Sequence, residues 1–256
     1  MKKIIYLSIF ILSNSVFADE AINWEGPYLG VTAGYAHGSA DAQSSTYRVP
    51  GGFYQTSTVN VINGTGTGTL DSNNALFGLK AGYSWRSDSL VYGVTSSISS
   101  INLKKSVSNS ATITNTYNMV REVDSNNLLT LEGKLGYLWN EQSLFYITAG
   151  IASTDLKLKR SFNDYTAGSP NDTMSSSNSI NSIKFGPTIG LGLESPLSNN
   201  WFLSAEYKFT KFSNISGSTN GLIYAGDGVS YHSETVFNDK TDLDINLITL
   251  GISKHF

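Results

Sequence analysis

Most of the chain alternates between apolar and polar residues with a period of two. In one stretch Phe77 and Leu79 share one face, while Gly78, Lys80 and Gly82 share the other. The same alternation recurs near residues 29–36, 90–101, 129–139, 145–151, 189–194, 201–210 and 248–256. Because successive side chains of a strand point to opposite faces, the pattern predicts eight β-strands.

The connections between these strands alternate strictly between long and short. Three are short, at Arg86–Ser89, Asn140–Ser143 and Pro196–Asn200. Four are long, at Gly38–Asn74, Asn102–Asn127, Ser153–Ser182 and Lys211–Asp242. Strands of about 10 residues joined in this rhythm are typical of a barrel with short periplasmic turns and long extracellular loops. We therefore expect an all-β, eight-stranded antiparallel up-and-down transmembrane β-barrel.

The tryptophans favour this barrel over a soluble β-sandwich, which would show the same alternation. All four lie beside the short-turn end of the expected strands, at Trp24, Trp85, Trp139 and Trp201. Tryptophan gathers at membrane–water interfaces because it is an apolar body with a polar edge. We expect the four rings to form a periplasmic aromatic girdle.

Three local features concern the long connections. Tyr54–Ile62 keeps a period of two, which predicts a strand continuing above the membrane as part of a hairpin. Gly64–Gly68 lacks the lysine and helix of a phosphate-binding loop, so we interpret it as a flexible loop tip. Upstream of Ile248 the assignment of apolar residues to the outer face fails, because the apolar Ile245 and Leu247 would point inward. A β-bulge, or a strand end already clear of the membrane, would explain that change.

The first residues have the form of an export signal. Lys2 and Lys3 precede the apolar run Ile4–Leu12, and Val16–Ala18 ends with a small residue. That run is shorter than the roughly 20 apolar residues of a transmembrane helix. We expect residues 1–18 to be a signal peptide and residues 19–256 to form the barrel domain, which would be exported to the outer membrane of a Gram-negative bacterium.

Composition excludes several classes of site. The chain has no cysteine, so disulfides, thiolate metal sites and a lipoprotein anchor are all excluded. Its formal charge of −3 becomes −5 when the two lysines of the signal are removed, which argues against nucleic acid as a partner. Only 14% of residues are charged, a low share for a soluble enzyme.

Several segments resemble the small outer-membrane β-barrel family of opacity-type porins and surface antigens. These are the opening Trp24–Gly30, the hairpin formed by Gly190–Glu194 and Asn200–Phe209, and the final strand Gly251–Phe256. The resemblance implies that the terminal Phe256 is an assembly signal read by the barrel assembly machinery. The chain departs from the family pattern at Lys254, which stands where the family usually has an aromatic residue.

Three acidic and three basic residues stand at strand positions whose side chains are expected to point into the barrel. They are Lys80, Glu132, Lys134, Glu194, Glu206 and Lys208. An eight-stranded barrel has an interior just wide enough for side chains to fill it. Because buried charges are costly unless they are paired, the matched signs favour a structural ion-pair network over an ion or proton path.

The remaining polar residues give little support to a hydrolase site or a metal site. His232 and Ser233 are adjacent on an extended chain and so point to opposite faces, and we place them in a solvated loop. His37 and His255 lie at opposite ends of the expected barrel, which disfavours a histidine metal site. We predict no catalytic residue, no cofactor-binding residue and no metal site.

These observations favour a non-enzymatic outer-membrane barrel that contributes to envelope structure and presents its loops for surface interaction, as an adhesin or antigen does. The expected partners are outer-membrane lipid and lipopolysaccharide, the assembly machinery, and a host surface or ligand at the loops. Three alternatives remain: a narrow porin-like channel, a loop-borne ligand binder such as one for haem, and a lipid A-modifying enzyme. The fold alone does not choose between them.

Overall fold

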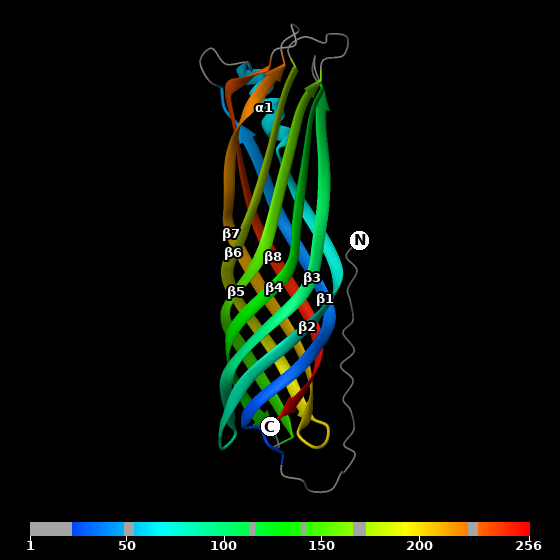
Figure 1. Cartoon of the computed structure of the whole chain (residues 1–256), viewed down its shortest axis with the longest axis vertical. Coiled ribbons are helices and arrows are strands. Elements are labelled where there is room, and N and C mark those ends of the chain that lie inside the picture. The colour runs from blue at the N-terminus through cyan, green and yellow to red at the C-terminus, as the bar shows by residue number, and fades with distance from the viewer. Residues whose placement is uncertain (1–21, 49–53, 113–115, 140–141, 166–172, 225–229) are drawn as a thin grey trace.

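The computed structural model describes residues 22–48, 54–112, 116–139, 142–165, 173–224 and 230–256. The expected signal peptide lies outside these residues. Eight antiparallel strands form one closed barrel in which each strand pairs with the next and β8 pairs with β1 (Figure 1). Their bounds are β1 Gly26–Thr46, β2 Thr67–Ser87, β3 Leu90–Thr112, β4 Thr116–Trp139, β5 Ser143–Tyr165, β6 Thr173–Pro196, β7 Trp201–Tyr224 and β8 Ser230–His255. The eight-stranded barrel predicted from the alternation is therefore confirmed.

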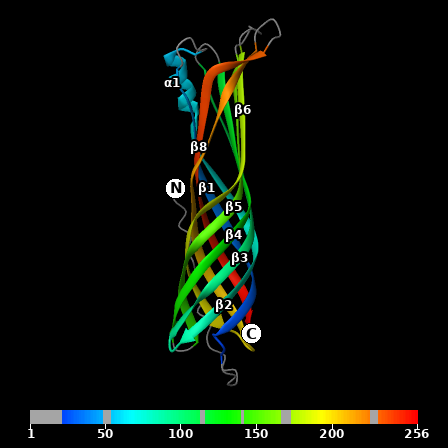
Figure 2. The same ribbon diagram turned by 60° about the vertical axis from the view of Figure 1, so that its left-hand side comes forward.

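Most of the large apolar side chains that face outward lie over the half of the barrel nearest the short turns. This band includes Leu29, Phe77, Ile98, Leu129, Ile151, Leu191, Tyr207 and Leu250. Beyond it the strands continue as a second half that we call the extension. The extension comprises residues 38–46, 67–74, 101–112, 116–127, 153–165, 173–182, 211–224 and 230–244. Figures 1 and 2 show that the strands are strongly tilted from the long axis in the band and run closer to that axis in the extension.

The four long loops predicted from the sequence are therefore mostly strand. In the first of them β1 continues to Thr46 and β2 begins at Thr67. The alternation persists there with its sense reversed, since Ala40 and Ala42 are buried inside while Asp41 faces outward. Water replaces lipid as the outer environment, so the polar face turns outward. The strands have 21 to 26 residues, not about 10.

One segment predicted as strand is a helix. Tyr54–Ile62 falls largely in α1 (Thr56–Thr65), where Val59 and Ile62 are buried three residues apart on one helical face. Gly64–Gly68, interpreted as a loop tip, instead ends α1 and begins β2. No helix among the described residues is long and apolar enough to cross a membrane.

The wall of the barrel is paired all round near the short turns but divides farther along the axis. The β2–β3 ladder ends at the pair Phe77 and Ser100, and the β6–β7 ladder is interrupted between Ser175 and Thr188. The other six ladders continue into the extension. The extension thus consists of two four-stranded sheets, β7–β8–β1–β2 and β3–β4–β5–β6, that face each other.

The interior changes its chemistry along the axis. Next to the short turns lies a cluster made of Trp24, Val91, Leu138, Leu144, Tyr146 and Phe202. The charged residues follow, and above them an aliphatic core fills the lower extension. Ile245 and Leu247 belong to that core, with exposures of 0% and 4%. The β1–β8 register is continuous past them, so the inward position of these two residues reflects this apolar layer and not a bulge in β8.

Candidate functional site

The charged residues of the band lie in the lumen and form ion pairs across it. Lys134 Nζ on β4 lies 2.5 Å from Glu194 Oε2 on β6, and both side chains are almost completely buried. Ser253 donates a hydrogen bond to the other oxygen of Glu194 at 3.3 Å. The ammonium also lies over the ring of Tyr146, 4.5 Å from its centroid. Lys134 and Glu194 thus satisfy each other where water is excluded.

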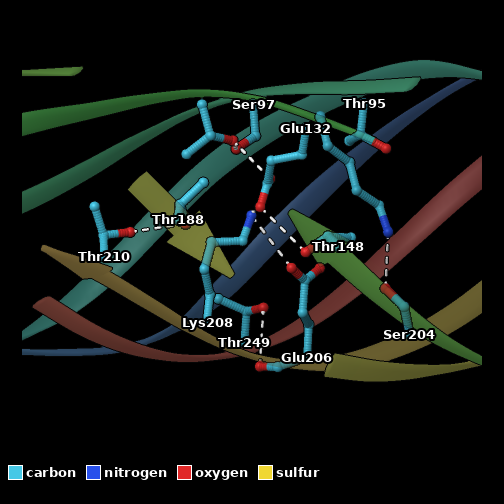
Figure 3. Close-up of polar contacts among 12 residues, drawn as sticks. Thr95, Ser97, Glu132, Thr148, Thr188, Ser204, Glu206, Lys208, Thr210 and Thr249 are labelled. Carbon is cyan, nitrogen blue, oxygen red and sulfur yellow. Dashed lines mark hydrogen bonds and ion pairs between the residues drawn. The ribbon is translucent and has the colours of Figure 1, made fainter. Parts of the chain in front are cut away.

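A second group joins opposite walls of the barrel (Figure 3). Lys208 Nζ on β7 lies 2.5 Å from Glu132 Oε2 on β4 and 3.2 Å from Glu206 Oε1. Because β4 and β7 are three strands apart in the ring, this contact spans the lumen. Glu132 also accepts hydrogen bonds from Thr130 at 2.9 Å and Thr148 at 3.1 Å. Hydroxyls therefore complete the coordination of the carboxylate.

Lys80 is the one member of the predicted set without an ion pair among the described residues. Its Nζ donates to Ser204 Oγ at 2.8 Å, again from one side of the lumen to the other. The structure thus joins five of the six predicted charges into two ion-paired groups and links the sixth to a hydroxyl. This arrangement gives a cross-linked interior and leaves the carboxylates occupied by their lysine and hydroxyl partners.

Aromatic side chains complete the filling of the lumen near the short turns. The hydroxyl of Tyr28 is hydrogen bonded to Thr95, and that of Tyr146 donates to Glu206 at 3.1 Å. Each ring lies against a glycine on a neighbouring strand: a Cβ at Gly192 would come within 2.4 Å of the Tyr146 ring. The glycines of the inward face therefore make room for these two rings.

Trp24 does not belong to the predicted aromatic girdle. Its side chain is 1% exposed and packs inside the barrel against Phe202, with ring centroids 4.7 Å apart. The chain turns at Gly26, whose φ of +109° few other residues adopt, so the segment before β1 folds back into the lumen. Proximity to the short-turn end was the basis of the prediction, and it does not distinguish a ring inside the wall from one outside.

The other three tryptophans face outward at the short-turn end. Trp85, Trp139 and Trp201 are 38%, 61% and 44% exposed. Phe256 also faces outward, and its backbone N–H donates to Pro27 O at 3.0 Å beside the junction of β8 with β1. Lys254 reaches back to the turn before β7, where its Nζ donates to Asn199 O at 2.6 Å.

His255 occupies an interior position whose packing role the sequence did not indicate. It is 1% exposed and lies between the rings of Tyr28 and Phe202, at centroid distances of 4.9 and 4.3 Å. Its Nε2 is 3.6 Å from Glu194 Oε1. The inward parity of His255 indicated burial, but the contact with Glu194 depends on the register between β6 and β8, which no local pattern encodes.

The other two histidines are distant from this site. His37 lies in β1 toward the extension and its Nδ1 is hydrogen bonded to Asn73 Oδ1 at 2.6 Å. His232 lies in β8 and not in a loop, although its side chain falls outside the described ones. Within the described part of the chain, no group of three or more His, Cys, Asp or Glu side chains is arranged to hold a metal ion.

The far end of the extension has a core of its own. Met119, Phe162 and Phe237 are completely buried beneath Val59 and Ile62 of α1. Tyr54, Tyr117 and Met174 belong to the same cluster. The hydroxyl of Tyr54 donates to Asp164 Oδ2 at 3.0 Å. Burial, together with the negative charge of Asp164, raises the pKa of Tyr54 above its usual value, which keeps the phenol protonated as a donor.

The chain was compared with protein families, curated proteins and solved structures. The family model described as "Outer membrane protein beta-barrel domain" matches residues 4–256. The 31 kDa outer-membrane immunogenic protein of Brucella melitensis biotype 1 is 28% identical over 192 residues, which are 75% of this chain and 72% of that protein. Among solved structures, OprG of Pseudomonas aeruginosa has a TM-score of 0.44 at 14% identity, covering 91% of this chain and 97% of its own. Ail of Yersinia pestis has a TM-score of 0.35 at 16% identity, covering 91% and 99%.

The ion pairs of the lumen should contribute to stability in a way that depends on both partners. Glu194→Ala leaves the buried Lys134 without its carboxylate, so the free energy of unfolding should fall by about 3–5 kcal/mol. Glu122→Ala is the control, because Glu122 makes only outward-facing pairs at 3.5 Å and its loss should cost less than about 1 kcal/mol. Urea unfolding in lipid vesicles, followed by tryptophan fluorescence, measures both values.

A double variant separates the ion pair from general damage to the lumen. Replacing Glu194 and Lys134 together by Met removes both charges, and should restore most of the stability that Glu194→Ala loses. A double variant as unstable as the single one would mean that shape, and not charge pairing, makes this position sensitive.

Proposed function

Because the chain belongs to the family of the outer membrane protein beta-barrel domain, and is thus an outer-membrane β-barrel protein, we propose that it acts as a closed, non-enzymatic barrel that presents its extension at the cell surface. The barrel would anchor the protein in the envelope. The extension would make contact with antibodies, host surfaces or ligands. Residues 1–18 would direct export and be removed.

The observation that carries this proposal is the folded extension. Its strands continue beyond the outward apolar band with polar residues facing out, and it has its own buried core beneath α1. A surface held on ordered strands suits specific recognition, because the free energy of binding is not reduced by the cost of ordering flexible loops. The extension is also the half of the barrel whose outer face is suited to water.

The names of related proteins agree with surface exposure. The Brucella relatives are called outer-membrane immunogenic proteins. Presentation of part of the protein outside the cell is consistent with that name, and we propose such presentation for this chain. The contact with lipid and lipopolysaccharide would be made by the outward apolar band.

The competing functions fit the interior less well. A narrow channel needs a continuous path, but ion pairs, tyrosine rings and an aliphatic core occupy successive levels of this lumen. A lipid-modifying enzyme needs a nucleophile beside a base. His37, near the middle of β1, and His255, at the end of β8, are nine residue pairs apart along the β1–β8 ladder, so they do not form one site. A haem binder needs a large apolar cavity, whereas the two best-formed cavities among the described residues have volumes of only about 20 and 10 Å³.

Surface presentation predicts opposite labelling of the two ends of the barrel. The chain has no cysteine, so single replacements provide unique labelling sites. Gln43→Cys, on the outer face of the extension, should react with a membrane-impermeant maleimide on intact cells. Ser198→Cys, in the short turn between β6 and β7, should react only after the outer membrane is permeabilised. The reverse pattern would invert the proposed orientation.

A closed lumen predicts no channel activity. Purified protein in a planar lipid bilayer should give no stepwise conductance above the leak of the bare membrane, because no water-filled path crosses the ion-paired level. A known porin reconstituted in the same membrane is the positive control. Reproducible steps that change size in Glu132→Gln would support the narrow channel in place of the proposal.

Phe256 is proposed as the signal that the assembly machinery reads. Phe256 directly follows β8, is 66% exposed and faces outward at the junction of β8 with β1. Deleting it should reduce the heat-modifiable, folded protein in outer-membrane fractions. Phe145→Ala, which truncates another outward aromatic, is the control and should insert normally. Equal amounts of folded protein in both variants would argue against this role.

A further inference from the structure

Two arginines face each other inside the extension. Arg121 on β4 and Arg160 on β5 are direct cross-strand partners, and both side chains point inward with exposures of 3% and 4%. Like charges placed opposite each other on neighbouring strands repel. Burial strengthens the repulsion because little water is present to screen it. The pair therefore requires negative charge nearby.

The carboxylate of Asp239 forms an ion pair with Arg160 and not with Arg121. Arg160 Nε donates to both oxygens of Asp239, at 2.9 and 3.1 Å. Ser44 Oγ donates to Oδ1 at 2.7 Å, and Asn178 Nδ2 donates to Oδ2 at 2.9 Å. Arg160 Nε has a single N–H, which is shared between both oxygens, so three donor groups bind this carboxylate. Among the described contacts of Asp239, none is a hydrogen bond from Arg121.

Arg121 remains without a carboxylate. Its Nη2 donates to the backbone oxygen of Thr67 at 3.0 Å, across the gap between β2 and β3. Its Nε and Nη1 are buried and have no acceptor among the described residues, and the same is true of Arg160 Nη2. Glu122 does not compensate, because it faces outward and pairs with Lys104 and Lys159.

The charge balance of this region is therefore positive. Two guanidinium groups and one carboxylate leave a net charge of +1 in a buried space. Loss of water around Arg121 lowers its pKa, while the negative charge of Asp239 opposes that change. Arg121 Nε, Arg121 Nη1 and Arg160 Nη2 are three buried nitrogens with unused N–H groups, and such groups are the donors that an anion accepts.

A cavity lies where these groups meet. Its volume is about 20 Å³ and it is partly open; Arg121, Arg160, Asn178 and Asp239 line it together with the apolar Val123, Leu158 and Ile180. A water-sized particle needs roughly 10–15 Å³, so the cavity holds one small ion but not a tetrahedral oxyanion with four oxygens. We propose that this cavity, the arginine chamber, binds a single monovalent inorganic anion of the halide class, chloride under ordinary conditions.

The bound anion would join the two sheets of the extension. Arg121 and Arg160 belong to the sheet β3–β4–β5–β6, while Asp239 and the Thr67 carbonyl belong to β7–β8–β1–β2. The ladders that would connect these sheets directly are interrupted at this level. Neutralising the second arginine removes a repulsion from the middle of the extension, so the extension should be more stable when chloride is present.

Bromide provides a direct test because it resembles chloride and scatters X-rays anomalously. Crystals of the wild-type protein grown in sodium bromide should show an anomalous peak within hydrogen-bond distance of Arg121 Nη1 and Arg160 Nη2. This test does not depend on any variant folding. Electron density for water alone at this position, without an anomalous signal, would overturn the proposal.

Unfolding equilibria provide a test in solution. At matched ionic strength, replacing gluconate, which is too large for the chamber, by chloride should raise the ratio of folded to unfolded protein in a saturable way. The increase is about tenfold when free chloride is nine times its dissociation constant. Arg121→Met should abolish this response, because it removes the unpaired charge and its donors.

Lys157→Met is the matched control for the second test. Lys157 lies on β5 near Arg160 but faces outward and is exposed, so its removal changes the total charge equally without touching the chamber. This variant should keep the chloride response of the wild type. A response that persists in Arg121→Met would place the chloride effect elsewhere and overturn the proposal.

Discussion

The structure depends on the requirement that every backbone N–H and C=O group be paired where the wall meets lipid. Lipid offers no hydrogen bonds, so a sheet that crosses it must close on itself. The closed pairing of all eight strands is found in the part of the outward apolar band nearest the short turns, up to Ser100 of β3 and Thr188 of β6. Beyond the band the wall meets water, which can satisfy an exposed strand edge. The β2–β3 and β6–β7 ladders are interrupted there, and the extension becomes two facing sheets.

The same change of surroundings determines the chemistry of the interior. In the band the outer face takes the apolar residues, so the inner face carries glycines, hydroxyls and charges, which must then pair with one another. In the extension the outer face is polar, and the inner face can hold an aliphatic core. Each strand thus reverses the sense of its alternation as it leaves the band. The reversal is visible in β8, where Leu250 faces outward and Leu247 faces inward.

This reversal explains which parts of the fold could be predicted from the sequence. In the band the number, order and approximate position of the strands followed from alternation, and so did the inward set of charges. In the extension the reversed alternation, in segments rich in serine and asparagine, was interpreted as loop. The sequence does not distinguish the helix α1 from a strand, because Tyr54–Ile62 also fits a period of two. The three-residue spacing of Val59 and Ile62 is the helical signal.

Contacts between distant strands could not be predicted in the same way. Alternation assigns Glu194 and Lys134 to the inner face, but which lysine reaches which carboxylate depends on the stagger of eight strands around the ring. Trp24 was misplaced because parity does not apply before the first strand, where a turn at Gly26 directs the chain into the lumen. Arg121 and Arg160 lay within expected loops, so no parity was assigned to them and their opposition was not visible.

The interior holds buried charges at two heights along the barrel axis, and the charges are balanced by opposite charges in the band but not in the extension. In the band, lysines and carboxylates are matched, and the donors of Thr130 and Thr148 complete the network. At the arginine chamber, Ser44, Asn178 and Arg160 donate hydrogen bonds to one carboxylate, that of Asp239, which faces two arginines. A level that is balanced by its own side chains needs nothing from solution. A level with one positive charge in excess is coupled to the ions around it, and in this protein that level lies in the half we propose to be exposed at the cell surface.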